Sequence, residues 1–442
     1  MSPIRIKILL LLLAGIVGRL PAQPAPDGGL PRRARLDATV QYAAGPVIGG
    51  RVTHLAAGGT AEKLGLQAGD IIMAIDGQAL DRAGAAAARV RLLPAGRELQ
   101  LAVRRGGGQI LLQGILPEVP RETYEQADVT YDSVMNAQGE KLRTIITRPK
   151  AGRGRRPAVF VVGWLSDDSV EAAAQNTDTI SRLFRSLAEK SGSVLVRLDK
   201  PGVGDSDGIC AETDFESELS GYQAAFRSLA KYDFIDPGRV FVLGLSNGGG
   251  FAPLVAAGAP VRGYITAGGW VKTWFEHMLE IERRRHTLGG EAPAQVSSAM
   301  KATAELYHDY LIAGRIPAEI FRGKPALAAL WEGDDHSTQY GRPPAFYQQL
   351  QKLNLAEAWG RVSVPTLAIH GQYDWIMSRE DPEIIAALVN RNRPGAGRFV
   401  ELPGTGHTLD HYASPADAFR WQAGPPEDST VRLILAWLEE NK

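Results

Sequence analysis

Hydrophobic residues in the C-terminal two-thirds of the chain gather in short, continuous runs. The runs lie at residues 157–162, 193–198, 240–243 and 398–402 and within residues 364–374. A continuous apolar run of this length is typical of a strand that is buried on both faces, as in a parallel sheet. Residues 129–147, with a turn at residues 136–139, predict an antiparallel hairpin ahead of these strands. Residues 251–257 predict a helix directly after the strand at residues 240–243.

A second pattern occupies the residues before this region, where short strands alternate with short helices. Strands are predicted at residues 50–56, 71–77 and 98–104, and helices at residues 59–65 and 83–93. Residues 117–126 contain Pro and Glu and predict a linker. Because 442 residues exceed one compact domain of ordinary size, the chain is expected to carry a small α+β domain at residues 36–116, followed by a larger one.

The N-terminal residues have the features of an export signal. Arg5 and Lys7 precede the ten-residue apolar run from Ile8 to Val17, and Ala22 is a small residue at a plausible cleavage site. A membrane-spanning helix needs about 20 apolar residues, so the run is short for a span. Residues 1–22 therefore predict a cleaved signal peptide and a secreted or periplasmic bacterial protein, with an uncleaved anchor as the alternative.

Composition excludes some classes of function. The chain has 49 basic and 49 acidic residues, so its net charge of zero provides no long-range attraction to nucleic acid. The basic clusters at residues 32–35 and 283–285 are expected to be solvated loop and helix faces. Cys210 is the only cysteine, which excludes an internal disulfide, and we expect it to be a small packed side chain.

A candidate nucleophile stands between a predicted strand and a predicted helix. Gly244 and Gly248 flank Ser246 at the second position on either side. Small residues at these positions permit a sharp turn that lifts the serine hydroxyl above the sheet, beside a helix N-terminus. In a chain with 49 glycines the motif alone fits equally well a turn without chemistry. The partners of Ser246 therefore decide between the two interpretations.

A nucleophilic serine requires a base and an acid that orients the base. Asp374 and His407 lie in the loops after the strands near residues 364–374 and 398–402. Because functional groups collect outside the carboxyl ends of parallel strands, we expect both to meet Ser246 at one sheet edge. Asp381 and Asp410 are rival acids, although Asp410 is expected to cap the following helix.

Two backbone groups are candidates for binding a developing oxyanion. The residue after the serine, Asn247, supplies one N–H, and Trp164, which follows the strand at residues 157–162, supplies the other. The glycine-rich loop at residues 199–208 has neither the Gly-Lys-Ser/Thr of a phosphate loop nor dinucleotide spacing, so a nucleotide role is not expected. His-Glu-x-x-His and zinc-binding cysteine pairs are also absent from the sequence, and no cofactor or metal is expected.

Together these motifs resemble the α/β-hydrolase superfamily over residues 127–442. The resemblance rests on the strand-Gly-Trp loop at Gly163, the Asp-x-x-Gly-x-Gly-x-Ser loop at residues 199–206, the serine turn, and the loops of Asp374 and His407. The resemblance implies an α/β fold with a doubly wound, mostly parallel sheet flanked by helices. It also implies an enzyme that hydrolyses an ester, thioester or amide through an acyl-enzyme. Residues 270–358 would then form a helical cap over the serine.

This chain departs from the family pattern at two positions. Val162 stands where relatives often have histidine before the oxyanion loop, which leaves the backbone donor intact but removes an ordering side chain. Pro253 is expected to shorten or bend the helix that follows Ser246, because it removes a backbone hydrogen bond.

Residues 36–116 resemble a PDZ domain of the bacterial type, most specifically at residues 61–72 and 75–77. The family implies capture of a peptide by strand addition. Asp37, however, would stand where the terminal carboxylate of a peptide binds, and like charges would weaken that binding. Two interpretations stay open, namely a peptide-binding domain and a domain that shapes the entrance of the hydrolase.

The remaining histidines have ordinary interpretations. His370 is expected to be packed and hydrogen-bonded, and His411 to lie on a helix surface or the rim of the pocket. Solvated or structural roles are expected for His277, His286, His308 and His336.

The sequence thus predicts a secreted serine hydrolase that cleaves carboxylic esters of a small-molecule acyl substrate, with Ser246, Asp374 and His407 as catalytic residues. The alternatives are a thioesterase, a serine peptidase that recruits peptides through the PDZ-like domain, and a PDZ-type adaptor with an inactive hydrolase fold. The acyl chain and the leaving group stay open at this stage.

Overall fold

The computed structural model describes residues 29–43, 48–80, 89–90, 92–152, 154–173, 176–333 and 336–442. The predicted signal peptide and most of the predicted helix at residues 83–93 lie outside these ranges. Among the described helices, none combines the length and the apolar character that crossing a bilayer requires.

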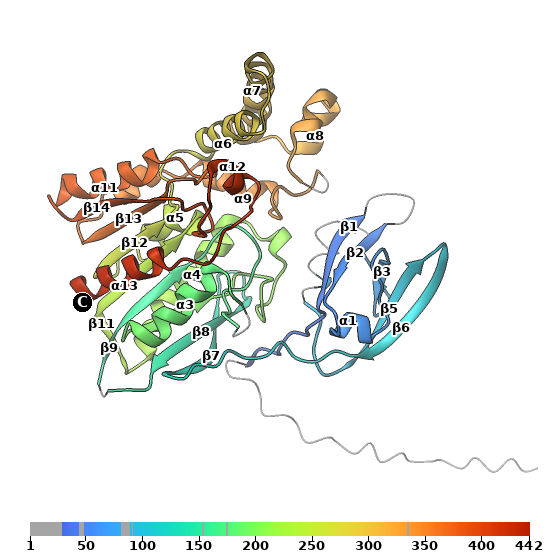
Figure 1. The fold of residues 1–442 in the computed structure, drawn as a ribbon, viewed down its shortest axis with the longest axis horizontal. Coiled ribbons are helices and arrows are strands. Elements are labelled where there is room, and N and C mark those ends of the chain that lie inside the picture. Colours follow the sequence, from blue (N-terminus) through green and yellow to red (C-terminus); the bar gives the residue numbers. More distant parts are fainter. Residues whose placement is uncertain are drawn as a thin grey trace, which may run out of the picture.

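An eight-stranded sheet forms the centre of the larger domain (Figure 1). Its strand order is β14-β13-β12-β11-β9-β10-β8-β7. The strands are β7 (Ala127–Met135), β8 (Lys141–Pro149), β9 (Arg156–Val162), β10 (Val194–Leu198), β11 (Ile235–Leu245), β12 (Gly263–Ala267), β13 (Thr366–Gly371) and β14 (Gly397–Leu402). Strands β9 to β14 pair in parallel, whereas β7 and β8 form an antiparallel hairpin. The mostly parallel sheet and its opening hairpin are therefore confirmed.

Helices cover both faces of this sheet because each buried strand is apolar on both sides. In β11, Val242 belongs to the hydrophobic core of one face and Leu243 to that of the other. The first face is covered by α4 (Phe215–Ser228), α5 (Asn247–Val255), α10 (Leu355–Trp359) and α11 (Glu380–Asn392), and the second by α3 (Thr179–Lys190) and α13 (Ser429–Asn441). The doubly wound arrangement is confirmed.

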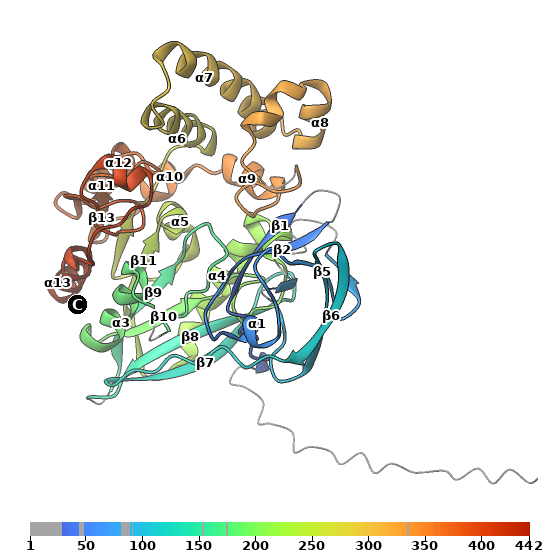
Figure 2. The same ribbon diagram turned by 45° about the vertical axis from the view of Figure 1, so that its right-hand side comes forward.

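A group of helices lies between β12 and β13 in the chain and gathers on one side of the sheet (Figures 1 and 2). It contains α6 (Trp274–Leu288), α7 (Pro293–Tyr307), the π-helical turn His308–Ile312, α8 (Pro317–Gly323), the 3-10 helix Pro325–Leu330 and α9 (Pro344–Gln351). Their aromatic residues, such as Tyr310 and Trp331, pack against one another in the core, with ring centroids 5.2 Å apart in this pair. We refer to residues 270–358 as the cap.

The smaller domain has an antiparallel sheet with the order β1-β2-β3-β5-β6. Its elements are β1 (Ala38–Ala43), β2 (Gly49–Leu55), α1 (Thr60–Lys63), β3 (Ile71–Ile75), β4 (Gln78–Ala79), β5 (Glu98–Arg105) and β6 (Gly108–Ile115). A core of its own, which includes Val52, Ile72 and Leu101, holds these strands together. The predicted strands are present, and β1 and β6 add two edges that the sequence pattern did not indicate.

Two arginines before β1 connect the smaller domain to the larger one. Arg32 donates hydrogen bonds to Glu171 at 2.6 Å and to Asp205 at 2.7 Å, and its residue is only 7% exposed. Arg33 donates to the carbonyl oxygens of Gly204 and Ser206. The expectation of a solvated cluster was therefore wrong for Arg32 and Arg33, because carboxylates and carbonyl groups distant in sequence surround them.

The segment that the sequence predicts as a linker is anchored by a buried ion pair. Arg197 of β10 binds both oxygens of Glu122 at 2.7 Å, and both side chains are fully buried. Burial raises the pKa of the Glu122 carboxyl, but the Arg197 charge and the hydrogen bonds from Arg197, Ala172 and Tyr124 together outweigh this effect and hold the pKa below its usual range. The pair therefore fixes the path of the chain between the two domains.

Removal of one member of this pair should destabilise the larger domain strongly. We expect Arg197→Met to lower the free energy of unfolding by about 3–5 kcal/mol, because Glu122 would stay buried without the opposite charge of Arg197, with only the hydroxyl of Tyr124 and the backbone N–H of Ala172 as donors. The double variant Glu122→Leu/Arg197→Met should lose less than the single variant. Urea unfolding checks both, with Arg361→Met as the control, because its pair with Glu357 is exposed and should change stability by at most about 1 kcal/mol. Equal losses for Arg197→Met and Arg361→Met would contradict the expectation.

Candidate active site

Ser246 occupies a strained turn between β11 and α5. Its backbone has φ 51° and ψ −122°, a conformation that few non-glycine residues adopt. A Cβ atom at Gly244 would lie 2.6 Å from Cα of Gly249, and one at Gly248 would lie 2.3 Å from the carbonyl oxygen of Gly163. Both glycines are therefore required, because the turn packs directly against backbone.

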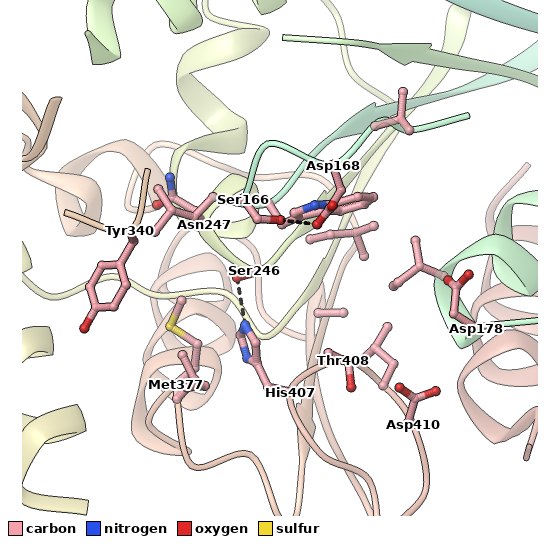
Figure 3. Close-up of a pocket in the computed structure, with 18 of the residues that line it drawn as sticks. Ser166, Asp168, Asp178, Ser246, Asn247, Tyr340, Met377, His407, Thr408 and Asp410 are labelled. Atoms are coloured by element: carbon pink, nitrogen blue, oxygen red, sulfur yellow. Dashed lines mark hydrogen bonds between the residues drawn. The ribbon is translucent and has the colours of Figure 1, made fainter. Parts of the chain in front are cut away.

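The structure brings Ser246, His407 and Asp374 into one hydrogen-bond chain. Oγ of Ser246 lies 2.9 Å from Nε2 of His407, and Nδ1 of His407 lies 2.9 Å from Oδ2 of Asp374. Figure 3 shows the hydroxyl of Ser246 pointing at the His407 ring. The three residues follow β11, β14 and β13, whose carboxyl ends meet at one edge of the parallel sheet.

Asp374 is held in its ionised form. Its Oδ1 accepts backbone hydrogen bonds from Ile376 and Met377, both at 2.9 Å. Burial raises the pKa of the Asp374 carboxyl, but His407 and the backbone donors outweigh burial and keep the pKa below its usual value. A buried carboxylate with fixed hydrogen bonds is suited to orient the imidazole and to stabilise its positive charge.

The two expected oxyanion donors lie just after the end of β9 and at the start of α5. Neither the backbone N–H of Trp164 nor that of Asn247 is used in a hydrogen bond within the described ranges. Asn247 is the first residue of the nine-residue helix α5, where backbone N–H groups have no intrahelical partner. The two N–H groups are therefore available to an anionic oxygen beside Ser246.

Two residues that no sequence motif indicated, Lys200 and Arg342, fix the loop of Trp164. Lys200 donates to the carbonyl oxygens of Trp164, Leu165 and Ser166, and Arg342 of the cap donates to Leu165 at 3.1 and 3.2 Å. Burial and the neighbouring Arg342 charge lower the pKa of Lys200 to about 8. The position of Lys200 after a predicted strand was its only sequence signal.

The rival acids do not reach His407. Asp381 is buried in α11 and accepts hydrogen bonds from the backbone N–H groups of Val271 and Lys272. Burial raises the pKa of Asp381 to about 6.

Asp410 also has a structural partner. It accepts a hydrogen bond from the hydroxyl of Thr179 at the start of α3. The expectation that it caps the following helix was wrong, because Ser414 caps α12 (Pro415–Phe419) and the loop before it folds back toward α3.

The other histidines lie in varied surroundings. His370 is buried, with Nε2 3.4 Å from the carbonyl oxygen of Met377. His411 lies in a loop paired with Thr405 and does not line the cavity, so neither expected location is correct. Three cap histidines have ordinary roles, namely an ion pair for His286, exposure for His308 and packing on Phe321 for His336. His277 differs from them, because it lines the cavity around Ser246.

A cavity of about 680 Å³ opens beside Ser246, a volume in the usual range of small-molecule sites. Trp274, Met278, Ile281 and Tyr340 of the cap form an apolar side of its wall. Asp168, Asp178 and Asp410 line another part, and Figure 3 shows these carboxylates and Tyr340 on opposite sides of Ser246. The cavity therefore has an apolar side and an acidic side around the serine.

Arg284 connects the cap to the loop that follows Asp374. Its guanidinium donates to the carbonyl oxygens of Trp375 at 2.7 Å and Ile376 at 2.8 Å. The expectation of a solvated helix face was therefore wrong for Arg284, although Arg283 is exposed. No group of His, Cys, Asp and Glu side chains in the described part of the chain is arranged to hold a metal ion.

Comparison with known proteins identifies the family. The chain belongs to the α/β-hydrolase family, whose sequence model matches residues 158–421. A PDZ domain precedes the hydrolase domain and matches at residues 51–105. No curated protein matches the sequence significantly.

Solved structures resemble the chain at low sequence identity and with TM-scores below 0.5. A hypothetical protein from Pseudomonas aeruginosa is 16% identical, with a TM-score of 0.43 and coverage of 73% of this chain and 96% of its own. Est1E from Butyrivibrio proteoclasticus, with ferulic acid bound, is 17% identical, with a TM-score of 0.44 and coverage of 70% and 96%. A hyperthermophilic esterase from the archaeon Pyrobaculum calidifontis is 16% identical, with a TM-score of 0.43 and coverage of 72% and 84%.

Enlarging Gly248 should disturb the turn that presents Ser246. We expect Gly248→Ala to lower the free energy of unfolding by about 1–3 kcal/mol, because the new methyl group meets backbone carbonyl groups at the end of β9. Gly323→Ala is the control, since a Cβ atom there meets open space. Urea unfolding compares the two variants, and equal stabilities would show that the turn has room for a side chain.

Proposed function

We propose that the protein is a serine hydrolase that cleaves carboxylic esters through an acyl-enzyme. The observation that carries the proposal is the hydrogen-bond chain from Asp374 through His407 to Ser246, at 2.9 Å for each contact. Beside it lie two backbone N–H groups that make no hydrogen bond to any described residue. Such an arrangement provides a nucleophile, a base, an orienting acid and a site for an oxyanion.

In the proposed reaction, Nε2 of His407 takes the proton of Ser246 as Oγ attacks the acyl carbon. The backbone N–H groups of Trp164 and Asn247 stabilise the oxyanion of the tetrahedral intermediate. His407 then protonates the leaving alcohol. In the second half of the reaction, His407 takes a proton from water as the water attacks the acyl carbon, and it returns this proton to Oγ of Ser246 as the acid is released. Asp374 keeps the proton of the imidazole on Nδ1 throughout, so that Nε2 can accept.

Thioester and amide hydrolysis use the same groups. The PDZ domain is the observation that favours a peptidase as the second candidate, because β1 pairs only with β2 in the described chain and offers an open edge for strand addition. We propose this edge as the peptide-binding surface. Asp37, just before β1, accepts hydrogen bonds from Thr60 and pairs with Arg35. Its carboxylate therefore fixes α1 and does not stand free.

We also propose that the enzyme works outside the cytoplasm. Arg5 and Lys7, followed by the short apolar run that starts at Ile8, support export by a cleaved signal. The mature chain would act in the periplasm or in the medium.

Removal of the nucleophile should abolish hydrolysis, and removal of the acid should weaken it severely. We expect Ser246→Ala to lose turnover of p-nitrophenyl esters. We expect Asp374→Asn to lower kcat by about 10⁴-fold, because the His407 imidazole is then no longer held in the tautomer with its proton on Nδ1. Asp381→Asn is the matched control, since Asp381 is a buried carboxylate of the same region without contact to His407. It should keep activity within a few-fold.

Rates on substrates with different scissile bonds separate the candidate functions. Initial rates on p-nitrophenyl esters of increasing chain length, on acyl thioesters and on aminoacyl anilides show which bond is cleaved fastest. A fluorophosphonate probe should label Ser246 in the wild type and Asp381→Asn but not in Ser246→Ala. Full activity in Ser246→Ala, or no labelling of folded wild type, would refute the proposal.

A further inference from the structure

His277 of α6 is a buried polar group in the cavity wall that the proposed reaction does not use. The residue is only 3% exposed, yet it lines the cavity that contains Ser246. Nδ1 is fully shielded without a partner, and neither ring nitrogen makes a hydrogen bond to the part of the chain that the structure describes. Buried polar groups are almost always hydrogen-bonded, so an unpaired imidazole in a binding cavity points to a ligand.

Neighbouring groups hold the ring in place. The His277 ring packs on Trp274, with centroids 4.8 Å apart, and on Trp270 at 6.2 Å. Thr273 and Glu276 form a capping box that fixes the first turn of α6, and Arg284 ties the helix to the loop of Asp374. The imidazole therefore has little freedom to turn toward a partner within the protein.

His277 is uncharged under ordinary conditions. Burial lowers its pKa most, the positive charges of Arg284 and His407 lower it further, and the value falls to about 3. A neutral imidazole has one N–H and one lone pair. Nδ1 of His277 is shielded, so it cannot reach a ligand. We therefore assign the proton to Nε2, which can donate it to a ligand in the cavity.

Other nitrogens of the same wall also lack partners. The Asn247 amide is oriented because its Oδ1 accepts from Trp270 at 3.1 Å, which leaves Nδ2 without an acceptor. The indole N–H of Trp274 has no acceptor either. These two nitrogens are shielded in the same way as Nδ1 of His277, so Nε2 of His277 is the nitrogen that can donate to a ligand, and its acceptor is an oxygen atom.

The charge of the cavity decides which kind of oxygen fits. Asp168, Asp178 and Asp410 line it, whereas no Lys or Arg side chain does among the described residues. A carboxylate or phosphate on the substrate would be repelled by these aspartates without a compensating cation. A hydroxyl, ether or carbonyl oxygen avoids this cost.

We propose that His277 is a specificity-determining residue that donates a hydrogen bond to an uncharged oxygen on the part of the ester substrate beneath the cap. The inference rests on the proposed ester hydrolysis at Ser246 and names its substrate class, namely uncharged esters that carry a hydroxyl, ether or carbonyl oxygen besides the scissile group. Alkyl esters of the same length lack this contact and are poorer substrates.

Matched substrates test the proposal. p-Nitrophenyl methoxyacetate and p-nitrophenyl butanoate have equal chain lengths, and 2-methoxyethyl acetate and butyl acetate place the same difference in the alcohol. The ratio of kcat/KM for the ether ester to that for the alkyl ester cancels general effects of a variant. In at least one pair we expect His277→Phe to lower this ratio about tenfold relative to wild type. His277→Gln, which can still donate, should restore most of it.

His308→Gln is the control variant, because His308 is exposed on the cap and does not line the cavity. It should leave both rates and their ratio unchanged. The wild-type ratio, corrected for spontaneous hydrolysis, should also stay constant from pH 5 to pH 8, because His277 does not titrate in that range. A ratio unchanged by His277→Phe in both pairs, or equal losses on ether and alkyl esters, would overturn the proposal and leave His277 with a packing role.

A binding measurement separates this inference from the proposed function and does not depend on the folding of a variant. N-(4-nitrophenyl)-2-methoxyacetamide and N-(4-nitrophenyl)butanamide are amide analogues of the first pair. The former should shift the Nε2 resonance of His277 in ¹⁵N-histidine spectra of the wild-type protein, and the latter should not. Loss of ester hydrolysis with this shift intact would refute only the proposed function, whereas equal shifts with both amides would refute the role of His277.

Discussion

The parallel register of the larger sheet is the constraint on which the active site depends. Leu245 pairs with Ala267, Ala267 with Ile369, and Gly371 with Leu402, so β11, β13 and β14 end at nearly the same level. A slip of one residue in β14 would move His407 by about 3.3 Å and turn the side chains of the strand to the other face. Contacts of 2.9 Å between three separate loops require this register.

Buried charges hold the loops that leave the sheet. Arg143 of β8 binds Asp199, Glu171 and Asp205, and Arg32 binds the last two from outside the domain. Asp199 also accepts the backbone N–H of Val170. The glycine-rich loop at residues 199–208 therefore organises the wall of the cavity by its carboxylates. Each of these charges is buried with several partners, as burial of an ion requires.

The cap completes the site from the opposite side. Arg342 holds the carbonyl oxygen of Leu165 in the oxyanion loop, and Arg284 holds the loop after Asp374. Two loops of the sheet edge are thus fixed by the same group of helices that covers Ser246. The cap therefore positions the loops around Ser246 as well as forming an apolar wall of the cavity, and His277 of α6 is part of that wall.

Local sequence patterns were enough to predict most strands of the larger sheet, the turn at Ser246 and the order of serine, acid and histidine, whereas β1 and β6 of the smaller sheet gave no such signal. Runs of apolar residues and flanking glycines are local signals, and the carboxyl-end rule then places Asp374 and His407 at one edge. The folded arrangement was needed to reveal the burial of Arg32, whose partner Asp205 is 173 residues away, and the contact of Asp410 with Thr179. It was also needed to show that Nδ1 of His277 is buried without a partner among the described residues. The environment of a charged or polar side chain depends on partners distant in sequence, which no local pattern specifies.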